Sequence, residues 1–273
     1  MPLVVLLAAL LSAREAALEP AWRTLEPGLE LGFFDGPPGA AGDGKIAVVR
    51  VDPALFELRL LNASAPGEGV PLSARDWAAR AGASAVINAS MYQEDYRTSV
   101  SLMRTRHHVN QARISRDRAA LVFDPVARTA PPVRMVDRDC EDLESALRTY
   151  GTVVQSIRMV SCSRRNVWAP SLRRSSVAAV GVDGRGRVLF LHARSAWPVH
   201  DLIEALLELP LDLRQAMYVE GGPEAQLYAR GGDQEVERLG AASTAGGGSA
   251  SGWPVPNVIA AVRRGPAPGA AAK

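Results

Sequence analysis

The sequence has no excess of charge of one sign and no apolar run that matches the thickness of a membrane. Its 31 Lys and Arg residues stand against 29 Asp and Glu residues, which leaves a net charge of +2. Nucleic acid is not expected as the main partner, because that binding draws much of its affinity from neutralised phosphates. The apolar run at residues 2–13 is well short of the ~20 residues that a spanning helix needs. We therefore expect no stable membrane span.

Cysteine and histidine are also scarce. The two cysteines, Cys140 and Cys162, match no zinc pattern, because such a pattern needs further Cys or His nearby. His107 and His108 are adjacent, so on a strand their side chains would point to opposite faces. We expect neither a bound metal nor a cofactor.

Residues 1–13 form a candidate signal peptide, because their apolar run ends in small residues, although no basic residue precedes it. This predicts export to the periplasm or the extracellular space. The alternative is a misassigned start or a hydrophobic leader on a cytosolic protein. In an exported protein, a disulfide between Cys140 and Cys162 would add roughly 3 kcal/mol. In a cytosolic protein both would be small buried thiols.

About eight strands alternate with a few short helices, which predicts an α+β fold with a mixed sheet. Turn signals at Asp52-Pro53 and at Asp183-Gly184 predict hairpins. Ser73 and Gly82 are expected to cap a helix. We expect one domain at residues 45–263. An N-terminal extension at 14–44 precedes it, and a disordered tail at 264–273 follows it.

The stretch from Tyr218 to Tyr228 is the candidate functional site. A short apolar strand breaks there at Glu220, and the two glycines that follow let a ligand approach the main chain closely. The order strand, helix, strand over residues 187–219 predicts parallel strands joined by a right-handed βαβ crossover. That crossover would bring Glu220 together with His192 and Arg194, beyond the carboxyl ends of the strands. Asn88 ends another apolar strand, either as a turn residue or as a polar group presented to a ligand.

Several segments occur in a recognisable order: INASMYQEDY, VVQSIRMV, RRSSVAAVGVDGRGRVLFLHARS, PLDLRQAMYVEGGPEAQLY and VPNVIAAV. In that order they resemble the phosphodiester glycosidase family, over roughly residues 45–263. The resemblance implies an α+β fold and hydrolysis of a sugar phosphodiester, in envelope or extracellular polysaccharide metabolism.

Three positions depart from the family pattern. Asn88-Ala89-Ser90 stands where members commonly have Asn-Gly-Gly, Glu220-Gly221-Gly222 where they have Asp-Gly-Gly, and Ser101-Leu102 where they have Gly-Leu. A Glu in place of Asp moves the charge about one methylene outward, and catalytic geometry tolerates little displacement. The site is therefore either rebuilt for another substrate or no longer catalytic. The second case would leave a saccharide-binding module that kept the pocket but lost the reaction.

The chemistry implied by this family assigns roles to the charged residues. Glu220 is the expected acid–base carboxylate. Its partner is not identified, because Glu224, Asp95 and Glu94 all remain open. The arginines would hold the phosphate, and the expected substrate-binding set is Asn88, Arg104, Gln155, Arg158, Arg174, His192, Arg194, Gly221 and Gly222. Alternatively, His192 is a histidine at a strand end whose hydrogen bonds are made within the protein, and Gln155 is an ordinary strand residue that faces solvent.

Overall fold

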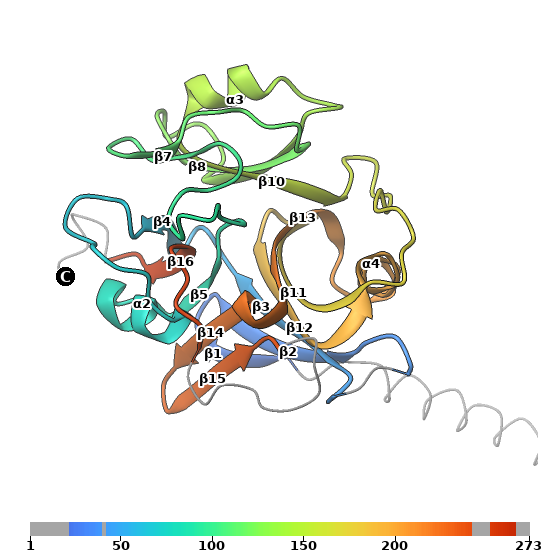
Figure 1. Ribbon diagram of the computed structural model, residues 1–273. Coiled ribbons are helices and arrows are strands. Elements are labelled where there is room, and N and C mark those ends of the chain that lie inside the picture. The colour runs from blue at the N-terminus through green and yellow to red at the C-terminus, as the bar shows by residue number, and fades with distance from the viewer. Residues whose placement is uncertain (1–21, 40–41, 242–251, 266–273) are drawn as a thin grey trace, which may run out of the picture.

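The computed structural model describes residues 22–39, 42–241 and 252–265, which form two β-sheets with helices on their outer faces (Figure 1). The larger sheet has eleven strands: β1 (Arg23–Glu26), β2 (Leu29–Asp35), β3 (Lys45–Val51), β6 (Met103–Arg104), β7 (Val109–Gln111), β8 (Ala119–Pro125), β9 (Val133–Asp137), β10 (Tyr150–Val160), β11 (Arg174–Asp183), β12 (Val188–Pro198) and β13 (Leu213–Gly221). Its strand order is β1-β2-β3-β12-β11-β13-β10-β6-β7, and the β8–β9 hairpin also pairs with β10. The smaller sheet has the order β15-β14-β5-β16-β4, built from β4 (Phe56–Asn62), β5 (Ala85–Asn88), β14 (Gln226–Gly231), β15 (Gln234–Leu239) and β16 (Asn257–Arg263).

Three α-helices lie in the described ranges: α2 (Ala74–Ala81), α3 (Leu143–Thr149) and α4 (Val199–Glu208). The predicted caps of α2 are confirmed. The Ser73 side chain accepts a hydrogen bond from Asp76 N, and Gly82 ends the helix with φ 61°. None of these helices is long and apolar enough to cross a membrane.

The predicted α+β fold with a βαβ crossover is wrong, because the chain is mostly β and every strand pair in the described residues is antiparallel. β12 and β13 do run in the same direction, but they never pair. β11 lies between them and bonds to both. The strand–helix–strand order alone could not reveal an intervening strand that comes earlier in the sequence.

One of the two predicted hairpins forms. β11 and β12 pair around Asp183-Gly184, with Val182 opposite Val188. The prediction at Asp52-Pro53 is wrong, because β3 pairs within the larger sheet and β4 pairs with β16 in the smaller one. The turn therefore carries the chain from one sheet to the other. Alternating apolar residues predict a half-buried strand but not the identity of its neighbour.

The main core lies between the two sheets. Inward side chains from both sheets, such as Val49, Phe190 and Ile259, are fully buried in one cluster. α4 covers the outer face of the larger sheet with Leu202 and Ile203, α2 covers the smaller sheet, and α3 packs against β8 and β10 (Figure 1). The layers therefore hold the strand ends of both sheets in fixed positions.

The larger sheet begins before Lys45. β1 and β2 extend it through the antiparallel pairing of β2 with β3. The candidate signal peptide at 1–13 and residues 266–273 of the expected tail lie outside the described residues.

Candidate functional site

Strand β13 ends in a bulge that redirects its last residues. Ala178 of β11 pairs with Glu220, whereas the next residue, Ala179, pairs with Tyr218, which leaves Val219 without a partner of its own. Such bulges bend a strand and re-aim side chains, and they are common beside functional sites.

The two glycines after Glu220 let neighbouring polar groups approach it. Gly222 has φ +68°, a left-handed conformation that favours glycine, and it opens the 3₁₀ turn η1 (Gly222–Glu224). A Cβ on Gly221 would collide with the Tyr218 hydroxyl, and one on Gly222 would lie 3.3 Å from Glu224 Oε2. A second carboxylate and a phenol are thus gathered around Glu220.

The surroundings of Glu220 favour its protonated form. Burial raises its pKa from 4.5 to about 7, and the Glu224 carboxylate adds to the increase, although Gly221 N donates a hydrogen bond to Glu220 Oε1 at 3.0 Å. A carboxyl group with a pKa near neutrality can both donate and accept a proton at physiological pH. That property suits a general acid or base.

Two tyrosines near the carboxylates remain neutral hydrogen-bond donors. Burial, together with the charges of Glu224 and Glu220, raises the pKa of Tyr92 to about 12. Burial also raises the pKa of Tyr218, again with a contribution from Glu220. Both phenols can therefore donate to substrate oxygens across the physiological pH range.

Asn88 and His192 hold the turn that carries the carboxylates. Asn88 Nδ2 donates to the Glu224 carbonyl at 2.8 Å, and Asn88 Oδ1 accepts from Gln226 N at 2.7 Å. His192 Nε2 donates to the Ala225 carbonyl at 3.1 Å. Burial lowers the pKa of His192 to about 4, so its ring is neutral. Both side chains are buried and bond to the backbone of the turn, which they help to position.

The expected phosphate-binding arginines fall into two groups. Arg174 and Arg194 are exposed, at the end of β11 and on β12, and no ion pair forms with either among the described residues. Their neighbour Arg173 is exposed too, and its charge acts on Tyr218. These guanidinium groups are free to meet an anion near the Glu220 end of β13.

The other expected residues are engaged elsewhere, along β10 and β6. Arg158 forms ion pairs with Asp137 and Asp139 at 2.5 and 2.8 Å. Gln155 is fully buried, and both ends of its amide bond to the backbone of the loop at 102–117. Arg104 donates to the carbonyl of Leu147 in α3. β10 pairs with β13, but the side chains of these three residues bond to groups other than Glu220.

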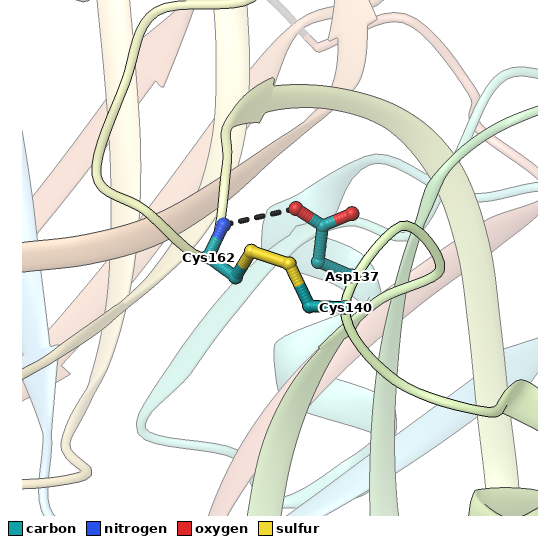
Figure 2. A group of neighbouring side chains, drawn as sticks. All are labelled: Asp137, Cys140 and Cys162. Carbon is teal, nitrogen blue, oxygen red and sulfur yellow. Dashed lines mark hydrogen bonds between the residues drawn. A yellow bond between two sulfur atoms is a disulfide. The ribbon is translucent and has the colours of Figure 1, made fainter.

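Cys140 and Cys162 are joined by a disulfide with their Cα atoms 6.6 Å apart, and Asp137 lies beside it (Figure 2). Asp137 Oδ2 accepts a hydrogen bond from Cys162 N at 2.9 Å. Three potential metal ligands meet here. Because the sulfurs are bonded to each other and metals bind the thiolate, this group is a structural staple rather than a metal centre.

The carboxylate pair lies on a half-exposed surface. A hollow of about 270 Å³ is bounded by Ile114, Arg138 and residues 141–144, and another of about 10 Å³ lies under α4. Neither is lined by Glu220 or Glu224. Glu220 and Glu224 are both partly exposed, so a ligand can reach them from solvent.

Sequence reasoning assigned no role to Tyr92, Tyr218 or Arg173, although Tyr218 begins the candidate stretch, and it left Glu224 as one of several choices for the second carboxylate. Arg173 lies in the basic run at 173–176, which alone looks like a solvated surface. Tyr218 precedes Glu220 in an apolar strand, where an aromatic residue is ordinary. The one signal that could have selected Glu224 is its spacing across the two glycines, which bend the chain back on itself.

The comparisons with known proteins identify the family and the fold. The model of the family described as "Phosphodiester glycosidase" matches residues 81–262, more than half of the chain. The catalytic domain of zebrafish N-acetylglucosamine-1-phosphodiester alpha-N-acetylglucosaminidase, auto-inhibited by its pro-peptide, is similar with a TM-score of 0.62 and 10% identity, over 90% of this chain and 87% of that one. A hypothetical protein from Synechocystis is similar with a TM-score of 0.60 and 13% identity, over 90% of this chain and 64% of that one. At these identities the similarity shows a shared fold. No curated protein matches the sequence.

Proposed function

The chain belongs to the phosphodiester glycosidase family, whose members are hydrolases of glycosyl phosphodiester linkages, and we propose that Glu220 is its acid–base carboxylate. The observation that supports this role is the raised pKa of Glu220, about 7, beside a second carboxylate, Glu224. Two carboxyl groups whose surroundings separate their protonation states can divide acid–base work between them.

In the proposed reaction, Glu220 takes a proton from a water molecule that attacks the anomeric carbon of the sugar. A C–O bond forms from the water oxygen, and the bond between the anomeric carbon and the phosphate oxygen breaks. The electron pair of that bond leaves with the phosphate. The Glu224 carboxylate stabilises the positive charge that develops on the sugar, as the second carboxylate of a glycosidase does.

The exposed arginines are the proposed phosphate ligands. Arg173, Arg174 and Arg194 lie near this end of the larger sheet, and a guanidinium group matches two phosphate oxygens at once. Tyr92 and Tyr218 would donate hydrogen bonds to the oxygens of the sugar or of the phosphate. Arg104, Gln155 and Arg158 have no part in this proposal, because Arg104 donates to Leu147, Gln155 to Asp117, and Arg158 pairs with Asp137.

We also propose that the protein works outside the cytosol, on envelope or extracellular polysaccharide. The disulfide between Cys140 and Cys162 supports this location, because such bonds persist in oxidising compartments.

A substrate panel tests the proposal. It consists of methyl phosphodiesters of the 1-phosphates of N-acetylglucosamine, glucose and galactose, offered to the wild type and to Glu220→Gln. We expect turnover of at least one by the wild type and a loss of about 10²–10⁴ in rate in the variant, the usual contribution of a general acid or base. Thermal unfolding is the control, because Gln is nearly isosteric and the fold should survive.

Two outcomes contradict the proposal. A wild type that binds these compounds without cleaving any of them is a saccharide-binding module. A Glu220→Gln variant that unfolds at a much lower temperature but keeps its rate would make Glu220 a structural residue of the turn.

A further inference from the structure

Aromatic side chains extend from the carboxylate pair in two directions. We call Tyr92, Tyr96 and Trp253 the tyrosine arm. Its tyrosine rings have centroids 5.8 Å apart, and Trp253 lies close enough to Tyr92 to lower the pKa of its phenol. The tyrosine arm starts near Glu224, because the charges of Glu224 and Glu220 act on the Tyr92 phenol.

The second group, which we call the arginine arm, consists of Trp168, Tyr218 and Arg173. The rings of Trp168 and Tyr218 have centroids 5.4 Å apart. The Tyr218 hydroxyl lies against Gly221, directly after Glu220. Both arms therefore begin beside the carboxylate pair. Arg97, which follows Tyr96, donates to the backbone carbonyls of Ala63 and Gly69. Arg173 of the arginine arm is exposed and forms no ion pair among the described residues.

The tyrosine arm is built to stay exposed. Tyr96 is 59% exposed and has φ 54°, a left-handed conformation that is costly for a bulky residue. Its turn is closed by the Tyr96 N bond to the Gln93 carbonyl at 3.0 Å and by Asp95 Oδ1, which accepts from Thr98 N at 2.9 Å. A turn that holds an aromatic ring toward solvent at such a cost points to a ligand for that ring.

Trp253 is presented in the same manner. It is 46% exposed, and its carbonyl accepts a hydrogen bond from the buried Gln226 side chain. Gln226 in turn donates its backbone N–H to Asn88, which also holds the Glu224 turn. The backbone of Trp253 is therefore tied to the turn that carries the carboxylates.

We propose that the substrate is an oligosaccharide joined to its phosphodiester, bound with its sugar chain over the tyrosine arm and its phosphate toward the arginine arm. This rests on the proposed hydrolase function of Glu220. Aromatic faces that carry a polar edge suit sugar rings, which have apolar C–H faces and hydroxyl rims. With the phosphate toward Arg173, further sugars of the chain would extend over the tyrosine arm, which begins with Tyr92 beside Glu224 and Glu220.

The test compares two substrates that share one aglycone. The sugar of the panel with the highest turnover is prepared as the monosaccharide and as the trisaccharide methyl phosphodiester. We expect the wild type to have a higher kcat/KM for the trisaccharide. Tyr96→Ala and Trp253→Ala should each lower that preference about tenfold, on the scale of one lost aromatic contact. Tyr96→Phe keeps the ring and should keep the preference, as should Val126→Ala, an exposed apolar residue of the β8–β9 loop.

The orientation of the substrate, with its phosphate toward the arginine arm, is tested by phosphate inhibition. Inorganic phosphate should inhibit Arg173→Ala about tenfold less strongly than it inhibits the wild type or Tyr96→Ala. The proposal that the sugar chain binds the tyrosine arm is wrong if the wild type has no higher kcat/KM for the trisaccharide. It is also wrong if that preference remains in both Tyr96→Ala and Trp253→Ala. Weaker phosphate inhibition in Tyr96→Ala but not in Arg173→Ala overturns this orientation.

A binding experiment distinguishes failure of the hydrolase proposal from failure of the tyrosine-arm proposal. In the Glu220→Gln background, the trisaccharide phosphodiester is titrated by tryptophan fluorescence, with and without Tyr96→Ala. If the wild type cleaves nothing, but Tyr96→Ala weakens this binding about tenfold, the hydrolase proposal falls and the tyrosine arm stands. Binding that is unchanged by Tyr96→Ala overturns the tyrosine arm whether or not the wild type is an enzyme.

Discussion

Two neighbouring regions bury polar groups in opposite ways: the turn after β13 and the flank of β10. On the β10 flank, the buried carboxylate of Asp137 meets Arg158 and a backbone N–H, and Gln155 has both ends of its amide bonded to the backbone. After β13, two carboxylates lie together, and burial holds the pKa of Glu220 near 7. On the β10 flank, opposite charges and hydrogen bonds offset the free energy lost when charged groups are buried. After β13, repulsion between two carboxylates adds to that loss.

This difference separates stability from function. A satisfied polar network stabilises the fold and leaves nothing for a ligand to bond. A carboxylate pair with a raised pKa costs stability but retains protons that can move at neutral pH. Both regions are rich in charge, so charge alone does not identify the functional site. The site is identified by a buried carboxylate that lacks an oppositely charged partner.

The largest expected effect on stability comes from breaking the satisfied region. Arg158→Ala would leave the Asp137 carboxylate buried without its cation, which typically costs about 3–5 kcal/mol. Chemical denaturation should show this loss, whereas the activity of the folded fraction should not change. Arg148→Ala is the matched control, because Arg148 pairs with Asp142 at 3.8 Å on an exposed surface, and such pairs contribute about 0–1 kcal/mol. Equal costs for both variants would contradict the comparison.

The disulfide is the next largest contribution. It closes a loop with a sequence separation of 22, for which chain entropy predicts about 3 kcal/mol. The double variant Cys140→Ser/Cys162→Ser should lose about that free energy of unfolding and keep its kcat on the panel substrate. A loss of kcat in the folded double variant would show that the β10 flank also shapes the site.

Local chemistry made part of this arrangement predictable. Gly221 and Gly222 indicate a turn that other residues would not adopt, and Glu220 before them is a poor candidate for plain surface. The caps of α2 and the turn at Asp183-Gly184 are equally local, and the structure confirms them.

Pairing between distant segments could not be predicted. Arg158 and Gln155 are ordinary strand residues until β9 and the loop at 102–117 are placed beside them. The same is true of β11, which separates β12 from β13 although it precedes both. Sequence periodicity indicates which face of a strand is buried but not which strand lies next to it.

A smaller expected effect is the change that Glu220 makes to the pH dependence of the free energy of unfolding. Its pKa rises from 4.5 to about 7 on folding, so its contribution is fully present below pH 4.5 and is lost as the pH rises through 7. Glu220→Gln removes that loss. We expect the variant to gain on the order of 2 kcal/mol over the wild type between pH 5 and pH 8, with allowance for partial exposure.

His192 gives the opposite slope and serves as the internal reference. Its pKa falls from 6.5 to about 4 on folding, so its contribution is present above pH 6.5 and is lost as the pH falls through 4. Urea denaturation across pH 4–8 should show this acid-side loss in both the wild type and Glu220→Gln. A free-energy difference between the two proteins that does not vary with pH would mean that folding does not raise the pKa of Glu220.

The smallest expected effect tests whether Glu224 acts on Glu220 as a like charge. Removing that charge in Glu224→Gln should lower the pKa of Glu220, because burial remains but the repulsion does not. The group that titrates in the pH profile of kcat/KM, followed on the panel substrate, should therefore move to lower pH by a fraction of a unit. Glu94→Gln is the control: Glu94 is exposed on the loop after Asn88 and does not contribute to the pKa of Glu220, so its profile should match the wild type. An unchanged profile in Glu224→Gln would mean that the two carboxylates do not interact, and Asp95 would then be the next candidate for the second carboxylate.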